Sequence, residues 1–357
     1  MKFFEKYVSN TTAGSTTQRL FKSDGKPHVS RVFYKIFAGG EYEYAFLFTN
    51  ITDSTFAEGE ETHRNQLGDS WDILSMRVAV CDEAAHDIPE EAFHALTFKG
   101  LPQKEVGPGE FFCTDGVRLN PKKDQYLCVE TVFCGEWIPY HHESVIASAL
   151  KTENGWEQTQ FVPFASMVGC DRPVKRRVAY WGDSITQGCG TEYNSYTHWN
   201  AVLSELLGEQ NAYWNIGIGY ARANDAATDG AWMFKAKQND VVIVCLGTND
   251  MRRYTEEQTR KDLMTIVTEL KKKGITVIVQ TLPPFGYEGE YAAKWLRLNE
   301  YIKTEIAAVA DRVTDVVPVL WVSEDQPSMP KYDGHPNAEG CRVWAKDLYR
   351  QIEDMLG

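Results

Sequence analysis

The sequence predicts a two-part protein of mixed α/β class, in which an antiparallel β-sandwich precedes a parallel sheet covered by helices. At 357 residues the chain is longer than a usual single domain. Its N-terminal half carries short strand patterns bounded by turn residues, whereas its C-terminal half alternates apolar strands with amphipathic helices. Such alternation is typical of a parallel sheet with helices on both faces. We expect the domains to occupy residues 1–170 and 171–357.

The N-terminal half shows the two-residue period of half-buried strands. Aromatic residues recur at every second position from Tyr42 to Phe48, and apolar residues alternate from Met76 to Val80. Residues 125–133 form a further run that is rich in aromatic and β-branched side chains. These segments predict the strands of an antiparallel sandwich.

Five apolar segments predict five strands in the C-terminal half: 178–181, 213–216, 241–246, 276–282 and 313–319. Between and after them, apolar residues at helical spacing predict helices near 199–207, 255–273, 295–306 and 344–352. The second of these has complete end signals. Thr255 and Gln258 form a capping box, and three lysines precede Gly274, as the helix dipole favours.

Four short motifs occur in order along this half. They are Gly182-Asp183-Ser184, Asn215-Ile216-Gly217-Ile218-Gly219, Gly247-Thr248-Asn249-Asp250 and Asp333-Gly334-His335-Pro336-Asn337. Each motif alone fits an ordinary turn or helix start, but the first three follow apolar strands. A second Gly-Asp-Ser, at 68–70, follows a polar run without a strand, so we interpret it as a solvated turn and do not expect Ser70 to react.

In order and content, the four motifs resemble those of the SGNH hydrolase superfamily, the GDSL-type esterases, from about Arg177 to the end. The resemblance implies a three-layer, flavodoxin-like domain. It also implies that Ser184 is the nucleophile and His335 the base, and that an oxyanion hole is formed by the Ser184 N–H, a glycine N–H and the Asn249 side chain. A preceding sandwich domain, which we expect to be jelly-roll-like, is similar to the layout of some carbohydrate acetylesterases.

These residue types suit acyl transfer. A serine hydroxyl is a poor nucleophile at neutral pH and needs an adjacent base, a role that suits histidine with its ordinary pKa near 6.5. Each donor aimed at the oxyanion contributes roughly 3 to 4 kcal/mol in known cases. An acid that orients the imidazole completes the triad.

The chain departs from the family pattern in two places. The family writes its last motif as Asp-x-x-His, whereas here Asp333 stands two residues before His335. Residues two apart in extended chain point the same way, so Asp333 is the first candidate to orient the base, with a Ser–His dyad or Asp325 as alternatives. The oxyanion glycine is also open: we favour Gly219 over Gly217, and the family often has glycine where Tyr220 stands.

Other polar residues receive less specific interpretations. We expect His141, His142 and Glu143 to be surface or interface residues rather than metal ligands, because adjacent side chains in a strand face opposite ways. His198 is expected to be a partly exposed helical residue. Three arginines that follow the second and third motifs can line the pocket rim or be solvated: Arg222, Arg252 and Arg253.

Composition limits the partners. With 37 basic and 50 acidic residues, the formal charge is −13, which disfavours nucleic acid and anionic membranes. We see neither a membrane-spanning run nor a secretory leader, and the eight cysteines form no Cys-x-x-Cys pair, so we expect a cytoplasmic protein. No cofactor or metal is expected, and the sequence leaves the oligomeric state open.

The sequence thus predicts a serine esterase that removes small acyl groups, acetyl above all, from carbohydrate. The segments 191–194 and 252–254 beside the motifs are polar and aromatic and offer no apolar run for a fatty chain. Three alternatives stay open: a lipid-type ester or thioester hydrolase, an acyltransferase of the same fold, and a non-catalytic carbohydrate-binding protein.

Overall fold

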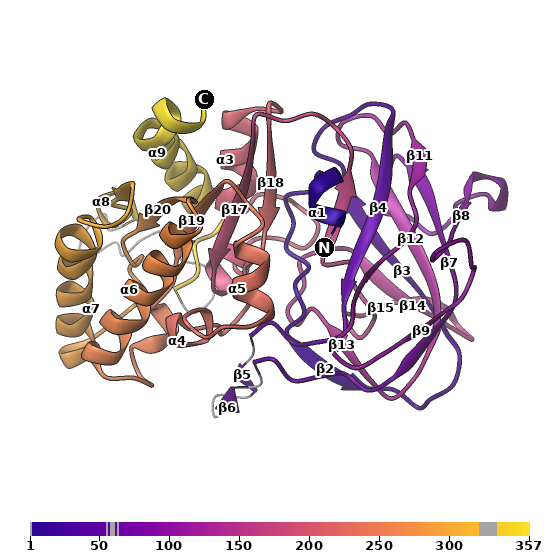
Figure 1. The fold of residues 1–357 in the computed structure, drawn as a ribbon, viewed down its shortest axis with the longest axis horizontal. Coiled ribbons are helices and arrows are strands. Elements are labelled where there is room, and N and C mark those ends of the chain that lie inside the picture. Colours follow the sequence, from indigo (N-terminus) through magenta and orange to yellow (C-terminus); the bar gives the residue numbers. More distant parts are fainter. Residues whose placement is uncertain (1, 55, 58–60, 63, 321–333) are drawn as a thin grey trace. The chain divides into compact units, whose positions relative to one another are not determined.

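The computed structural model describes residues 2–54, 56–57, 61–62, 64–320 and 334–357. The chain divides into two compact units, which we call unit 1 (1–53 and 63–173) and unit 2 (54–62 and 174–357). Unit 1 is built from antiparallel strands and unit 2 from a helix-covered parallel sheet (Figure 1). The predicted fold class is therefore confirmed.

Unit 1 contains a five-stranded sheet, a seven-stranded sheet and a strand pair, all antiparallel. The first has the order β1 (Val8–Ser9), β16 (Met167–Cys170), β4 (Tyr42–Thr49), β10 (Phe111–Cys113), with β11 (Val117–Leu119) also on β4. The second has the order β15 (Gly155–Gln158), β14 (Ser148–Thr152), β3 (His28–Lys35), β12 (Tyr126–Cys134), β7 (Trp71–Cys81), β8 (His94–Leu96), with β9 (Lys104–Val106) on β7. The remaining elements are the pair β13 (Trp137–Tyr140) and β2 (Arg19–Lys22), and the short helices α1 (Phe3–Lys6) and η1 (Glu90–Ala92).

Burial follows the strand patterns that the sequence shows. The three expected strand segments correspond to β4, β7 and β12. In β7, Trp71, Ile73, Met76 and Val78 are buried whereas Asp72 is exposed. The pairing with β12 shifts by one residue between Ile73 and Ser75, so residues 71 and 73 share the covered face with 76 and 78. In contrast, β4 is buried at every position from residue 44 to 49, so both of its faces are covered.

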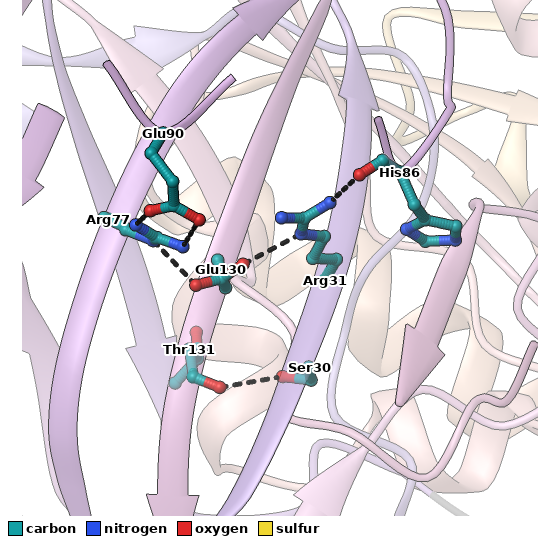
Figure 2. Close-up of polar contacts among 7 residues, drawn as sticks. All are labelled: Ser30, Arg31, Arg77, His86, Glu90, Glu130 and Thr131. Atoms are coloured by element: carbon teal, nitrogen blue, oxygen red, sulfur yellow. Dashed lines mark hydrogen bonds and ion pairs between the residues drawn. The ribbon is translucent and has the colours of Figure 1, made fainter. Parts of the chain in front are cut away.

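A row of charges crosses the seven-stranded sheet. Pairing places Arg31 of β3 and Arg77 of β7 on either side of Glu130 in β12. Figure 2 shows both guanidinium groups converging on this carboxylate: Arg31 Nε lies 2.8 Å from Oε2 and Arg77 Nε 2.6 Å from Oε1. Arg77 also pairs with the exposed Glu90, and Arg31 donates to the backbone oxygen of His86. Glu130 is therefore a buried carboxylate shared by two arginines, an arrangement that opposite charges on neighbouring strands favour.

Unit 2 is built on a five-stranded parallel sheet in the order β18-β17-β19-β20-β21, which is the flavodoxin-like order 2-1-3-4-5. Its strands are β17 (Arg176–Gly182), β18 (Asn211–Asn215), β19 (Val241–Cys245), β20 (Thr276–Gln280) and β21 (Arg312–Thr314). Its helices are α2 (Ser184–Gln187), α3 (Trp199–Leu207), α4 (Ala223–Ala226), α5 (Ala231–Ala236), η2 (Thr248–Asp250), α6 (Glu256–Lys272), α7 (Gly289–Tyr301), η3 (Ile302–Ile306), α8 (Val317–Leu320) and α9 (Ala338–Leu356). A short antiparallel pair, β5 (Phe56–Ala57) and β6 (Glu61–Thr62), also belongs to this unit.

The helices of unit 2 form as their sequence signals predict. Thr255 caps α6 by accepting a hydrogen bond from the Gln258 N–H at 3.1 Å. Helices α3 and α9 pack against each other through the stacked rings of Trp199 and Trp344, whose centroids are 4.8 Å apart. Helices α4, α6 and α7 form a second packed group.

One predicted strand is wrong in part. We expected a strand over 313–319, but β21 ends at Thr314 and Val317 begins the helix α8. The carboxylate of Asp315 accepts the Val317 N–H at 3.1 Å, which caps the new helix. Pro318 then lies within the first turn of the helix, where the missing proline N–H costs nothing.

Candidate active site

The first three motifs meet at the carboxyl edge of the parallel sheet. Ser184 follows β17, Gly217 follows β18 and Asn249 follows β19. These three strands are neighbours, with β17 in the middle. The chain runs from β17 to β18 on one side of it and then crosses to β19 on its other side. This edge is therefore the topological switch point, where open α/β sheets bind their ligands.

Ser184 and His335 lie within hydrogen-bond distance. Ser184 begins α2, and its Oγ is 2.7 Å from Nε2 of His335, which lies just before α9. Both residues are buried, with 9% and 8% of their surface exposed. The ring of Phe285 packs edge-on against the imidazole at 5.1 Å. A Cβ on Gly190 would lie 2.7 Å from Cβ of His335, so the glycine permits the close approach of the His335 loop.

Asp183 fixes the turn that carries Ser184. Its side chain accepts the Ile185 N–H at 3.0 Å and so caps α2. The carboxyl group is fully buried, and this burial raises the pKa of Asp183 to about 7. Asp183 thus acts on the backbone beside the serine rather than on the histidine.

A buried amide network supports α2 from below. Asn215 of the second motif and Asn200 of α3 both donate to the carbonyl oxygen of Thr186, at 2.9 and 2.6 Å. They also bond to each other at 3.2 Å. Sequence reasoning missed Asn200, although a polar residue in line with the apolar Leu203 and Leu207 on one helix face was a usable signal.

In both candidate glycines of the second motif, the backbone N–H already donates a hydrogen bond. Gly217 donates to Oδ1 of Asn215 at 2.9 Å, and Gly219 donates to Oε1 of Gln187. A Cβ on Gly217 would lie 2.4 Å from the backbone nitrogen of Gln187, so this glycine allows the second motif to touch α2. The next residue, Tyr220, has a φ of +61°, a conformation that favours glycine.

Asn249 lies in η2, and its side-chain amide donates to the carbonyl oxygen of Ala221 at 2.9 Å. One of its two N–H bonds is used in this way, since an amide nitrogen carries two donors. A second tie between the same loops is the Ala223 N–H, which bonds to the Asp250 carboxylate at 2.9 Å. The loops after β18 and β19 are therefore linked next to the serine.

A cavity of about 580 Å³ opens beside these groups in unit 2. Its lining is aromatic, polar and basic: Tyr220, Arg222, Thr248, Asn249, Met251, Arg252, Arg253, Phe285, Gly286, Tyr287 and Gly334. The three arginines of the second and third motifs do line a pocket, as one of our two interpretations had it. None of these lining residues is acidic, and they do not form a long apolar channel.

Several predicted residues stand elsewhere. Asp333 and its alternative Asp325 lie outside the described residues. Ser70 is exposed directly before β7 of unit 1, in keeping with the solvated turn that we expected.

Two histidines are more buried than we expected, and a third has a lowered pKa. His198 was expected to be a partly exposed helical residue, but it is buried at the capping position before α3. His141 is also buried rather than on the surface, and its Nδ1 lies 2.8 Å from the backbone oxygen of Thr16. Burial, followed by the Arg19 charge, lowers the pKa of His142 to about 4. Within the described part of the chain, no group of three or more His, Cys, Asp or Glu side chains could hold a metal ion.

Comparison with known families agrees with this geometry. Residues 180–343 match the model of the GDSL-like Lipase/Acylhydrolase family. The matched segment contains Ser184, Asn249 and His335. Among curated protein sequences, none matches this chain.

Solved structures resemble the chain in its fold. A family two carbohydrate esterase from Clostridium thermocellum, solved with cellohexaose, covers 98% of this chain and 99% of its own at 12% identity and a TM-score of 0.44. A lipolytic G-D-S-L protein from Veillonella parvula covers 50% and 98%, at 17% identity and 0.43. The esterase EstA from Pseudoalteromonas, inhibited by monoethylphosphonate, covers 50% and 97%, at 14% identity and 0.42. At these TM-scores, none of the likenesses says anything about the substrate of this chain.

None of the described helices is both long enough and apolar enough to cross a membrane.

Proposed function

We propose that this protein is a serine esterase that hydrolyses small acyl esters, acetyl above all, on carbohydrate through an acyl-enzyme on Ser184. One observation carries the proposal: the 2.7 Å contact between Ser184 Oγ and His335 Nε2 at the sheet edge where the family motifs meet. Neutral imidazole accepts a proton through Nε2, so this contact is that of a nucleophile and its base.

The reaction takes two steps. In the first, Ser184 Oγ attacks the carbonyl carbon while its proton passes to His335 Nε2; the ester C–O bond then breaks, and the same proton goes to the departing alkoxide. In the second, a water molecule gives a proton to His335 while the water oxygen attacks the acyl carbon. The bond to Ser184 breaks, the proton returns to Oγ, and the free acid leaves.

Three donors would stabilise the oxyanion in each step: the Ser184 N–H, the Asn249 side chain and one N–H of the second motif. For the last we proposed Gly219 from the sequence, but its N–H already donates to Gln187. This commitment favours the backbone N–H of Tyr220 instead, because Tyr220 lines the cavity and has the positive φ of the glycine that the family often has there.

Asp333 remains our proposal for the carboxylate that orients His335. We also propose that residues 171–357 form the catalytic domain and residues 1–170 an accessory domain. The catalytic assignment is supported by the positions of Ser184, Asn249 and His335, which all lie in unit 2.

The cavity supports the carbohydrate assignment. Its lining combines flat aromatic rings, such as Phe285 and Tyr287, with amide and guanidinium donors. Sugar rings offer apolar faces for stacking and hydroxyl groups for hydrogen bonds, so such a mixed surface suits them. The same lining is a poor site for a fatty chain, which needs continuous apolar cover at about 0.8 kcal/mol per methylene.

The first test removes the nucleophile. Ser184→Ala should abolish hydrolysis of p-nitrophenyl acetate, because no other group can carry the acyl intermediate. The matched control is Ser70→Ala, which changes the serine of the other Gly-Asp-Ser and should retain full turnover. Near-normal turnover by Ser184→Ala, with thermal unfolding unchanged, would end the serine-esterase proposal.

The second test compares acyl chain lengths. We expect kcat/KM to fall steadily from p-nitrophenyl acetate to the octanoate, because the cavity offers little apolar surface to the added methylenes. Acetate release from acetylated oligosaccharides should then exceed that from short alkyl acetates. Values that rise toward the octanoate would favour a lipid-type hydrolase, and acyl transfer to an added sugar in preference to water would favour an acyltransferase.

A further inference from the structure

The cavity that Asn249 and Gly334 help to line has basic described lining residues in a protein that is acidic overall. The chain carries a formal charge of −13, yet the charged side chains among the described lining residues are all arginines: Arg222, Arg252 and Arg253. Exposed charges elsewhere are strongly screened by salt, whereas a concave site focuses the field of the groups that line it. The charge of these described lining residues is thus opposite to the net charge of the whole chain.

Arg222 does not supply the free charge. Its guanidinium is 3% exposed and bonds to both carboxylate oxygens of Asp225, at 3.0 and 3.3 Å. The pair is neutral as a whole, and the guanidinium lies over the ring of Tyr254 at 5.8 Å. This residue is therefore part of the cavity wall, and the lining arginine without a carboxylate partner among the described residues is Arg252.

Arg252 and Arg253 are exposed and lie two and three residues after the end of the third motif. The guanidinium of Arg252 lies over the ring of Tyr291 at 5.8 Å, a contact that restrains the side chain and leaves its N–H groups available. Within the described part of the chain, no carboxylate forms an ion pair with Arg252.

The loop that carries the two arginines is held rigidly. Lys294 of α7, which is 7% exposed, donates from Nζ to three backbone oxygens of this loop: those of Asp250 at 3.1 Å, Met251 at 3.0 Å and Tyr254 at 2.6 Å. These bonds enclose Arg252 and Arg253 on both sides. The loop conformation, and with it the direction in which the arginines leave the backbone, is consequently fixed before any ligand arrives.

We propose that Arg252, with Arg253 beside it in the cavity lining, binds an anionic group on the sugar that bears the acyl ester, so that the substrate is an acylated acidic carbohydrate. This inference rests on the proposed esterase function and narrows its substrate. Guanidinium groups bind planar carboxylates and sulfates through paired hydrogen bonds that are stronger than those between neutral partners. The anion is the carboxylate of a uronic acid or a sulfate ester, both of which present oxygens to such a fork.

The experiment uses pairs of substrates that differ only in charge. Methyl glucopyranoside and methyl glucopyranosiduronate, each acetylated at the same hydroxyl, differ in a CH₂OH against a carboxylate; a 6-sulfated glucoside forms the third arm. At low salt we expect kcat/KM for one of the charged esters to exceed that for the neutral ester by about tenfold or more. The arm with the larger ratio identifies the anion.

Variants test whether the two arginines cause this preference for the charged ester. Arg252→Gln/Arg253→Gln should bring the charged-to-neutral ratio close to one, whereas Arg350→Gln, at an exposed arginine of α9 outside the cavity lining, should preserve it. In the wild type the ratio should also fall as salt rises from about 10 mM to about 500 mM, because the Debye length shrinks. This salt series tests the proposal even if the double variant fails to fold.

The outcomes separate the two proposals. If p-nitrophenyl acetate is hydrolysed but the charged and neutral sugar esters react equally, the anion site is wrong and the esterase stands. If no ester is hydrolysed faster than by Ser184→Ala, the esterase proposal fails. The anion site is then judged by titrating the Ser184→Ala protein with the unacetylated uronide and glucoside. Equal affinity for both would overturn it, and tighter binding of the uronide that weakens with salt would support it.

Discussion

At the scale of single residues, the active-site loops contain two carboxylic acids that are fully buried. The Asp250 carboxylate accepts the Ala223 N–H, yet burial outweighs this bond and raises the pKa of Asp250 to about 7. Asp183 has a similarly raised pKa for the same main reason. Both groups therefore gain protons in the folded state at mildly acidic pH.

Asp250 makes stability depend on pH in a defined direction. Between its ordinary pKa of 3.8 and about 7, the folded protein retains a proton that the unfolded chain has released, so stability falls as pH rises through this window. Asn at position 250 can still accept the Ala223 N–H but carries no charge. We therefore expect Asp250→Asn to gain stability relative to the wild type, by a few kcal/mol at most, as pH rises from about 5 to about 8.

Urea unfolding of both proteins across this pH range checks the prediction. Since Asp183 titrates in both, it cancels in the difference. A difference between the two proteins that does not change with pH would show that Asp250 is ionised in the fold.

The residues that can be predicted from sequence are those whose chemistry is fixed by type and order. Ser184, Asn249 and His335 belong to this class. The hydrogen bond from the Gly219 N–H to the Gln187 side chain cannot be predicted, because Gln187 lies 32 positions earlier and reaches the second motif only in the folded chain. The same holds for Lys294, whose role depends on which backbone oxygens face its amine.

At the scale of elements, the position of Ser184 depends on how closely the second motif approaches α2. A Cβ at position 217 would lie 2.4 Å from the backbone nitrogen of Gln187 and 2.7 Å from the carbonyl carbon of Thr186. Backbone atoms cannot move aside as a side chain can. An alanine at this position must displace α2 and the serine that begins it.

Gly217→Ala should therefore lower kcat for p-nitrophenyl acetate by about 100-fold, the usual effect of a displacement near 1 Å at a reacting centre. Gly274→Ala is the matched control: Gly274 has a φ of +74° and open space around its missing Cβ. It should lose about 1 kcal/mol of stability and keep its turnover. Wild-type kcat in Gly217→Ala would mean that α2 tolerates the shift.

The elements themselves follow local signals where these are complete. The capping box at Thr255 and the lysines before Gly274 predict the ends of α6 well, since they act within a few residues. The strand predicted over 313–319 is wrong in part because the apolar residues of this segment also suit a helix. The helix α8 begins there because Asp315, which directly follows the short strand β21, caps it.

At the scale of the whole molecule, the proposed reaction and the buried charges around Glu130 belong to different units. The proposed catalytic residues lie in unit 2, whereas the shared carboxylate of Glu130 lies in unit 1. The buried carboxylate of Glu130 pairs with two arginines, Arg31 and Arg77 (Figure 2). A change there should affect folding without touching the reaction.

Glu130→Gln should destabilise unit 1 by about 3 kcal/mol or more, because it leaves the buried Arg31 without its counter-charge. Glu90→Gln is the control, since Glu90 pairs with Arg77, a partner that the two acids share, but its side chain is 75% exposed, where ion pairs contribute little. We expect the midpoint of thermal unfolding to fall clearly in the first variant and hardly in the second. In both, kcat for p-nitrophenyl acetate, measured well below that midpoint, should match the wild type. An equal loss of stability in the two variants would contradict the buried-pair argument, and a loss of kcat in folded Glu130→Gln would show that unit 1 contributes to the reaction.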